Sequence, residues 1–173
     1  MDFRKIFIAA ALSCTALTAC SQADQATHQP SVTAETHQNM ETDMQADPKI
    51  AVVEEMITAW NEKEWNKIAD LFTEDGVLHS MMIDPVVGRE TIRKRIVGLG
   101  EGLSEITLNI INIGRINDVV VIERVDEFTY KGHKGKVPVV GILEVEGDKV
   151  KVWREYYDRA ELLAEMGLEH DFD

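Results

Sequence analysis

The stretch VVVIERVDEF, residues 119–128, has the alternation of a β-strand but carries two charges on a face that should be apolar. Successive side chains of a strand point to opposite faces, so Arg124 and Asp126 share one face with Val120, Ile122 and Phe128. Charged groups in apolar surroundings are costly unless they are paired. The pattern therefore predicts a cavity-lining face on which the arginine and the aspartate have partners.

A third charge comes from the predicted last strand, residues 149–157. Alternation places Glu155 between Trp153 and Tyr157 on one face, and we expect both rings to line the same pocket as the Arg-x-Asp pair. The opposite face would then carry Val150, Val152, Arg154 and Tyr156. If the two charged faces coincide, one arginine lies among two carboxylates in a mostly apolar cavity.

Such a trio has a definite chemistry. An arginine stays ionised and can hydrogen-bond both partners, which fixes their geometry. Two carboxylates close together in a low dielectric cannot easily both ionise, so one tends to keep its proton. A base and an acid then lie side by side, which is what the addition of water across a strained ring requires.

Three helices are expected before the long strands. The first begins at Asp47-Pro48, a suitable N-cap and first-turn pair, and has apolar residues at helical spacing as far as Trp60. Asn61 with Glu64 can cap a second helix, whose apolar face is Trp65, Ile68 and Phe72. A third helix is predicted over residues 89–99.

The remaining elements are extended. Strands are predicted over residues 76–80, 106–114, 119–130, 137–146 and 149–157, with loops at 84–88 and 131–136. A short closing helix follows, with Asp158 as its cap. This order predicts an α+β fold, in which a cone-shaped, curved antiparallel or mixed sheet wraps around about three helices.

The segments ERVDEF and WREYYD together resemble the limonene-1,2-epoxide hydrolases, within the nuclear transport factor 2-like superfold. The stretch LFTEDGVLHSM…PVVGRETI is also similar to that family's region from the second helix to the third. The resemblance implies that Arg124 bridges the carboxylates and that Asp126 is the general acid. The family's general base is an aspartate directly after Trp-Arg, and here that position is Glu155. Its water-holding tyrosine and asparagine fall on Leu78 and Ser80.

The resemblance implies hydrolysis of an apolar small-molecule epoxide to a diol, without a metal or an organic cofactor. One alternative is a non-catalytic lipoprotein that binds an apolar small molecule on the same scaffold. A further alternative is an isomerase of the ketosteroid type, in which Asp126 or Glu155 shuttles a proton and Tyr157 stabilises an enolate. His79 alternates away from Leu78 and Ser80, so we expect it to be structural.

The N-terminal 20 residues have the pattern of an export signal: Arg4 and Lys5, then an apolar run too short to span a bilayer. Their ending, Leu-Thr-Ala-Cys, resembles the bacterial lipobox, which implies lipidation of Cys20 and attachment to the cell envelope. Ser21 after the cysteine implies the outer membrane if the host is Gram-negative. Residues 21–46 are polar and read as a disordered tether, and residues 47–173 as the folded domain.

The chain has 173 residues and a net charge of −13, which argues against nucleic acid as a partner. It says little about a small neutral substrate. The expected ligand, an apolar small molecule, is what the resemblance implies, and contact with a membrane is expected through the lipid anchor alone. The outer sheet face with Val150, Val152 and Tyr156 would permit a homodimer.

Overall fold

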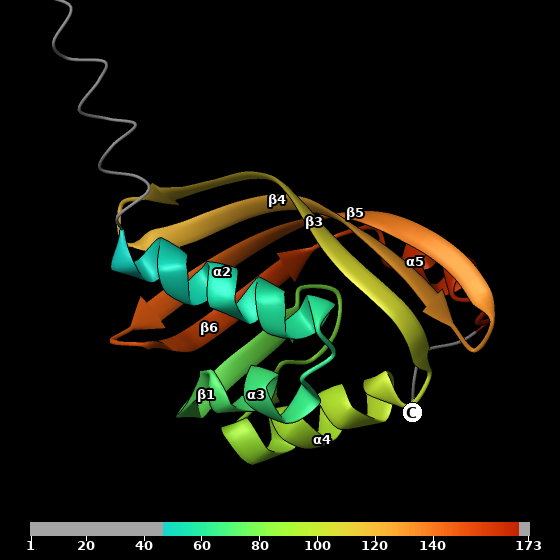
Figure 1. Cartoon of the computed structure of the whole chain (residues 1–173), viewed down its shortest axis with the longest axis horizontal. Helices are drawn as coiled ribbons and strands as arrows, with labels where there is room; N and C mark the ends of the chain where they lie inside the picture. Colours follow the sequence, from blue (N-terminus) through green and yellow to red (C-terminus); the bar gives the residue numbers. More distant parts are fainter. Residues whose placement is uncertain (1–46, 170–173) are drawn as a thin grey trace, which may run out of the picture. The chain divides into compact units, whose positions relative to one another are not determined.

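The computed structural model describes residues 47–169, so the expected signal, the tether and Cys20 lie outside the described residues. The described part is an α+β domain built on one curved sheet, as the sequence predicts (Figure 1). Its helices are α2 (Pro48–Asn61), α3 (Trp65–Asp70), α4 (Arg89–Gly100) and α5 (Arg159–Glu165). Its strands are β1 (Phe72–Ser80), β2 (Val86–Val87), β3 (Leu103–Ile116), β4 (Val119–Tyr130), β5 (His133–Glu146) and β6 (Lys149–Tyr156).

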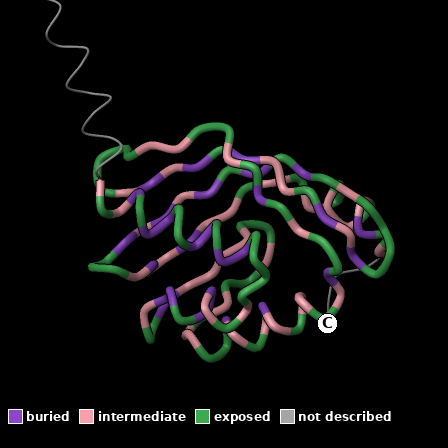
Figure 2. The backbone as a smooth tube through the Cα atoms, viewed as in Figure 1, coloured by how far each residue is buried: buried purple, intermediate pink, exposed green. Residues whose placement is uncertain are grey.

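The sheet has six strands in the order β2-β1-β6-β5-β4-β3, and it is mixed because β1 runs parallel to β6 while all other neighbours are antiparallel. The long strands β3, β4 and β5 bend together, and α2 lies along the concave side (Figure 1). Buried and exposed positions alternate along these strands (Figure 2), as expected for a sheet with one covered face.

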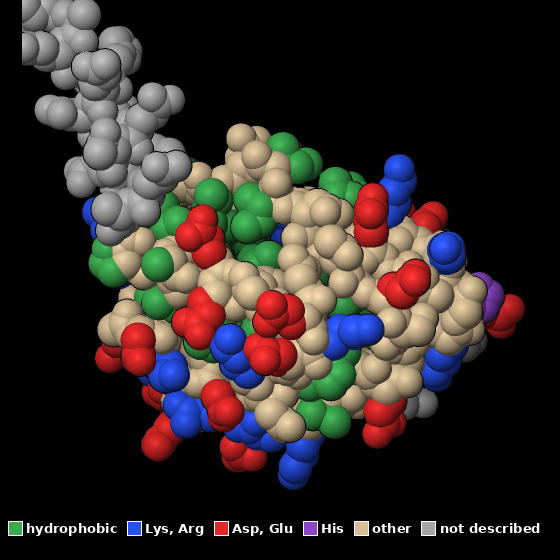
Figure 3. Space-filling view, in the orientation of Figure 1, with side chains coloured by type: hydrophobic (Ala, Val, Ile, Leu, Met, Phe, Trp, Pro, Cys, Tyr) green, Lys and Arg blue, Asp and Glu red, His purple; other side chains and the backbone are tan. Residues whose placement is uncertain are grey.

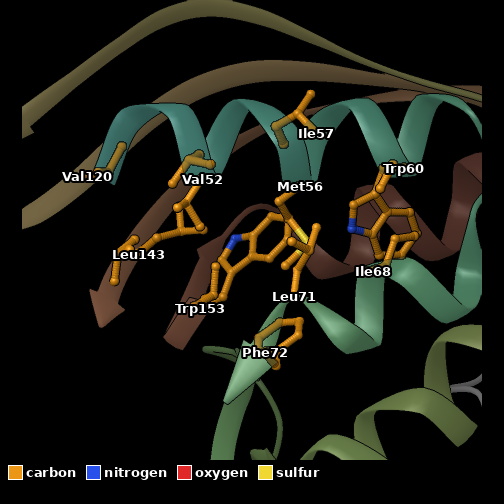
Figure 4. Packing of buried hydrophobic residues seen from close by; sticks show 14 of the residues in the cluster. Val52, Met56, Ile57, Trp60, Ile68, Leu71, Phe72, Val120, Leu143 and Trp153 are labelled. Carbon is orange, nitrogen blue, oxygen red and sulfur yellow. The ribbon is translucent and has the colours of Figure 1, made fainter. Parts of the chain in front are cut away.

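The main core lies between α2 and the concave side of the sheet. The Trp153 ring of β6 lies below α2, near Met56, and stacks on Phe72 with ring centroids 6.4 Å apart (Figure 4). A second apolar cluster lies nearer to α5, where Phe128, Val139 and Met166 are buried. Trp65, Leu99 and Ile106 pack against both clusters.

Two expected helix caps are present. Asp47 accepts a hydrogen bond from the Lys49 backbone N–H at 2.9 Å, and Asp158 accepts one from Glu161 N–H at 3.1 Å. The predicted Asn61 cap is wrong, because Asn61 is the last residue of α2 and its Oδ1 accepts a hydrogen bond from Leu108 N–H at 2.7 Å. No side chain caps the start of α3, and this helix ends at Asp70, so Phe72 belongs to β1 instead.

Several predicted boundaries also differ. The first strand begins at Phe72 rather than at residue 76, and the expected loop 84–88 contains the short strand β2. The expected loop 131–136 is only a two-residue turn, because β5 already begins at His133. Lys131 and Gly132 both have positive φ in this turn, 46° and 89°, which suits the right-handed twist of a hairpin.

The predicted orientation of Val150 is wrong. Val150 pairs with Val145 and Val152 with Glu144, so Lys151 is an extra residue that forms a β-bulge. The bulge turns Val150 inward, where it is as fully buried as Trp153. Val152 and Tyr156 remain on the outer face.

The face in Figure 3 carries acidic and basic side chains interspersed over its helices, and hydrophobic side chains where α2 lies alongside β3 and β4. Within residues 47–169, the helices are all too short or too polar to cross a membrane.

Candidate active site

Arg124, Asp126 and Glu155 meet on the concave side of the sheet. Arg124 donates from Nε to Asp126 Oδ1 at 2.7 Å and from Nη2 to Asp126 Oδ2 at 3.1 Å. The same Nη2 also donates to Glu155 Oε1. Arg124 is 2% exposed, whereas the carboxylate side chains are 15% and 17% exposed. The arginine is therefore the buried bridge, and both carboxylates reach the space in front of it.

Gly141 makes this bridge possible. On β5 it is paired with Ile122 of β4 on one side and with Glu155 of β6 on the other. A Cβ at this position would lie 3.1 Å from Arg124 Nη1 and 3.0 Å from Trp153 Nε1. The Arg124 side chain can cross from β4 to β6 because the strand between them has no side chain at this point.

The environment of Asp126 differs from that of an exposed aspartate. Burial raises the pKa of Asp126, the charge of Arg124 opposes this rise, and the charge of Glu155 adds to it. Burial alone would lower the pKa of Arg124, but the charges of Asp126 and Glu155 outweigh it, so its pKa is raised. Arg124 stays charged, and Asp126 holds a proton more readily than an exposed aspartate does.

A polar pair lies beside Glu155. Ser80 is directly opposite Glu155 in the parallel register of β1 and β6, and Tyr157 Oη donates to Ser80 Oγ at 3.0 Å. Burial raises the pKa of Tyr157, while hydrogen bonds with Ser80 and Arg159 work against the rise. The phenol therefore stays protonated at neutral pH and remains a donor, which leaves the serine hydroxyl proton free for another acceptor.

These side chains line a pocket of about 730 Å³, within the range typical of small-molecule sites. Its wall combines residues of both apolar clusters. Among the predicted pocket residues, Leu78, Ser80, Trp153 and Tyr157 all line it together with the charged trio. Trp153 also lies under Arg124, with the guanidinium carbon 5.3 Å from the ring centroid, and such a cation–π contact helps to hold the charge in place.

His79 is not part of the pocket lining. It is half-buried, and its Nε2 lies 3.1 Å from the Ile83 carbonyl oxygen. No cluster of His, Cys, Asp and Glu that could hold a metal ion is found within residues 47–169.

Several residues of the site were missed by the sequence reasoning. Gly141 lies under Arg124 and Trp153; an isolated glycine inside a predicted strand signals a close approach of other groups, so it could have been singled out. The basic residues Lys94, Arg95, Lys131 and Arg159 also line the pocket. They come from a helix, a turn and a helix start, and no local pattern indicates that these segments meet.

The arrangement combines a carboxylate able to accept a proton, a carboxyl able to donate one, and a hydroxyl pair beside the first. It suits reactions in which a small molecule gains or loses protons at two nearby atoms. The apolar wall suits a ligand of low polarity.

Solved structures share this fold. A protein from Catenulispora acidiphila with a ketosteroid isomerase-like fold, in complex with trimethylamine, is 26% identical; the match covers 70% of this chain and 96% of that one, with a TM-score of 0.62. An LEH-like epoxide hydrolase of M. tuberculosis is 18% identical over 72% of this chain and 91% of that one, with a TM-score of 0.62. An NTF2-like protein from Anabaena variabilis is 24% identical over 67% and 93%, with a TM-score of 0.59.

The family model described as a SnoaL-like domain matches residues 53–153, which run from α2 to the strand that carries Glu155. The match spans more than half of the chain and includes Arg124, Asp126 and Gly141. With its curved mixed sheet and NTF2-like structural neighbours, the chain belongs to the SnoaL-like domain family.

Proposed function

We propose that this protein hydrolyses an apolar small-molecule epoxide to a diol by acid- and base-assisted attack of water. The observation that carries the proposal is the contact of the single buried Arg124 side chain with both Asp126 and Glu155 at the wall of an apolar pocket. The resemblance of ERVDEF and WREYYD to limonene-1,2-epoxide hydrolases supports the same reaction.

In the proposed step, Glu155 accepts a proton from water as the water oxygen bonds to an epoxide carbon. The carbon–oxygen bond of the ring breaks, and the leaving oxygen takes the proton of Asp126. Glu155 ends with one proton more and Asp126 with one fewer, and exchange with solvent restores both. Arg124 holds the two carboxyl groups in place, and its positive charge stabilises whichever of them is ionised.

Ser80 and Tyr157 are the proposed water-positioning groups. The family's tyrosine and asparagine have no equivalents at Leu78 and Ser80, but Tyr157 brings a phenol to Ser80 from the end of β6. A water molecule between the Ser80 hydroxyl and the Glu155 carboxylate would have one donor and one base in reach.

The test is to incubate the purified protein with a panel of apolar epoxides in ¹⁸O-labelled water and to detect diol by mass spectrometry. Wild type is expected to form diol with one labelled oxygen, and Glu155→Gln to lower the rate about 100-fold or more. Glu144→Gln is the matched control, because Glu144 is on the outer face and pairs with Arg154 there, so its rate should stay within about twofold of wild type. If no epoxide gives diol above the buffer rate, or if Glu155→Gln is as fast as wild type, the mechanism is wrong. Ligand binding without diol would point to the non-catalytic module.

We also propose that Cys20 is acylated and anchors the protein to the cell envelope. The supporting feature is the Leu-Thr-Ala-Cys ending after an apolar segment. Metabolic labelling with an alkyne fatty acid should tag the wild-type protein and should not tag Cys20→Ser.

For assembly, we propose a homodimer through the outer sheet face, where Val140 and Tyr156 are paired neighbours and are 38% and 42% exposed. A second copy of the same face would cover both. Sedimentation equilibrium should give twice the monomer mass, and Val140→Lys should give the monomer mass. A monomer for the wild type would rule the dimer out.

A further inference from the structure

Basic side chains outnumber acidic ones in the pocket lining. The lining includes Lys94 and Arg95 of α4, Lys131 of the β4–β5 turn and Arg159 at the start of α5. The acidic residues of the lining are Asp126 and Glu155, and both are already bonded to Arg124. With Arg124 included, the lining has five basic side chains against two acidic ones.

The excess of basic over acidic residues in the pocket lining contrasts with the domain as a whole, which is acidic. Residues 47–169 contain 16 Lys and Arg against 24 Asp and Glu. Several basic side chains elsewhere on the domain pair with acids, as Arg93 does with Asp70 at 2.6 Å and Arg154 with Glu144 at 2.6 Å, while others, such as Lys134 and Lys149, form no ion pair within the described residues.

Two of the basic residues at the pocket differ from those pairs. Lys94 and Lys131 are both exposed, and neither forms an ion pair within the described part of the chain. The Lys131 ammonium lies 5.2 Å from the centroid of the Tyr130 ring, which is itself part of the pocket wall. The charges of Lys94 and Lys131 are thus available to a bound ligand whose end extends out of the pocket on their side.

We propose that the pocket takes an elongated apolar molecule that ends in an anionic head group, a carboxylate or a monophosphate, with the head group at Lys94 and Lys131. This inference rests on the proposed function and names the substrate class of the same site. The apolar body would lie against Phe128, Val139 and Met166, which are buried in the wall. Low-dielectric walls beside a basic rim focus the field and raise the local concentration of an anion.

The charges also fix the direction of binding. An anionic group at the deep end would face the Glu155 carboxylate, while Arg124 is already shared by two acids. An anionic group at the rim stays in contact with water and with the lysines, so it avoids the cost of burying a charge. The reactive, uncharged end of the molecule therefore points inward to the trio.

The test compares matched ligands on the purified full chain by isothermal titration calorimetry. Decanoate, decyl phosphate and 1-decanol share one chain length and differ in the head group. At low salt, at least one anionic ligand is expected to bind about five- to tenfold more tightly than 1-decanol. The preference should shrink to about twofold at 0.5 M salt, because exposed charges are screened there. The stronger of the two anions identifies the head group.

Variants locate the effect. The double variant Lys94→Gln, Lys131→Gln is expected to lose most of the preference for the anion, measured as the ratio of the anion's affinity to that of 1-decanol. The matched control is Lys134→Gln, Lys149→Gln, which removes the same two charges from residues outside this pocket and should keep the preference. Equal affinity for decanol and both anions, or no binding of any of them, overturns the proposal.

Turnover separates this inference from the proposed reaction. If neutral epoxides give diol but anionic ligands bind no more tightly than 1-decanol, the proposed hydrolysis holds and the proposed anionic head group is wrong. If the anion binds more tightly but a medium-chain epoxy carboxylate gives no diol, the proposed ligand class holds and the proposed hydrolysis is wrong.

Discussion

Arg124 crosses the sheet directly over Gly141, where a Cβ would lie 3.1 Å from Nη1. Arg124 Nη1 and Trp153 Nε1 are buried there and have no hydrogen-bond partner within the described residues. The guanidinium is thus hydrogen-bonded through Nε and Nη2. Its Nη1 lies in the space that the absence of a side chain at Gly141 leaves open.

Gly141→Ala is the first prediction. The added methyl group has to displace the guanidinium or the indole, and overpacking of this kind lowers the free energy of unfolding by about 1–3 kcal/mol. Urea unfolding measures the loss, and the diol assay should show a fall in activity because Arg124 moves. Gly114→Ala on β3 is the control, since a Cβ there meets nothing within 4 Å; its stability should change by about 0.5 kcal/mol or less. Equal effects of the two changes would contradict the role given to Gly141.

Removal of the arginine is the second prediction. Arg124→Met leaves Asp126 and Glu155 in an apolar wall without their bridge, and breaking a buried pair in this way lowers the free energy of unfolding by about 3–5 kcal/mol. Adding Asp126→Asn and Glu155→Gln to Arg124→Met removes both orphaned carboxyl groups, so the triple variant should be more stable than the single one. A triple variant that is less stable than Arg124→Met would mean that the charges are not coupled through the arginine.

Much of this site could be predicted because period-two alternation is local. Arg124, Asp126 and Glu155 were each placed on an inward face from their own strand, and the α+β order of elements brought the two strands into one sheet. Val150 was misplaced because a bulge at Lys151 depends on the pairing with β5, which one strand's sequence does not contain. The partner of Asn61 is the backbone of Leu108, 47 residues away. The Asn-x-x-Glu pattern predicts a local helix cap at Asn61, but the contact with Leu108 takes its place.

The third prediction concerns pH. The folded-state pKa of Asp126 is raised above its usual value, chiefly by burial. The folded protein therefore binds a proton more tightly than the unfolded chain, so this group's contribution to stability is full below the usual aspartate pKa of about 3.9 and is lost as the pH rises through the raised value. The free energy of unfolding of wild type minus that of Asp126→Asn should fall over this interval. Urea unfolding at a series of pH values measures it, and a difference that grows with pH would contradict the sign.

The last prediction separates two neighbouring tyrosines, Tyr156 at the end of β6 and Tyr157 directly after it. Tyr157→Phe removes the hydrogen bond to Ser80 Oγ, which is 3.0 Å long, and leaves the ring in the pocket wall. Since Ser80 then loses the group that orients its hydroxyl beside Glu155, kcat for epoxide opening should fall about tenfold, or roughly 1.4 kcal/mol in barrier, with KM within about twofold. Tyr156→Phe makes the same chemical change on the outer face, where Tyr156 is 42% exposed, and should leave both constants unchanged. Ser80→Ala should reproduce the loss, and the double variant Ser80→Ala, Tyr157→Phe should be no slower than either single variant, because the two hydroxyls act as one unit. Additive losses in the double variant would show that Tyr157 acts on the substrate independently of Ser80.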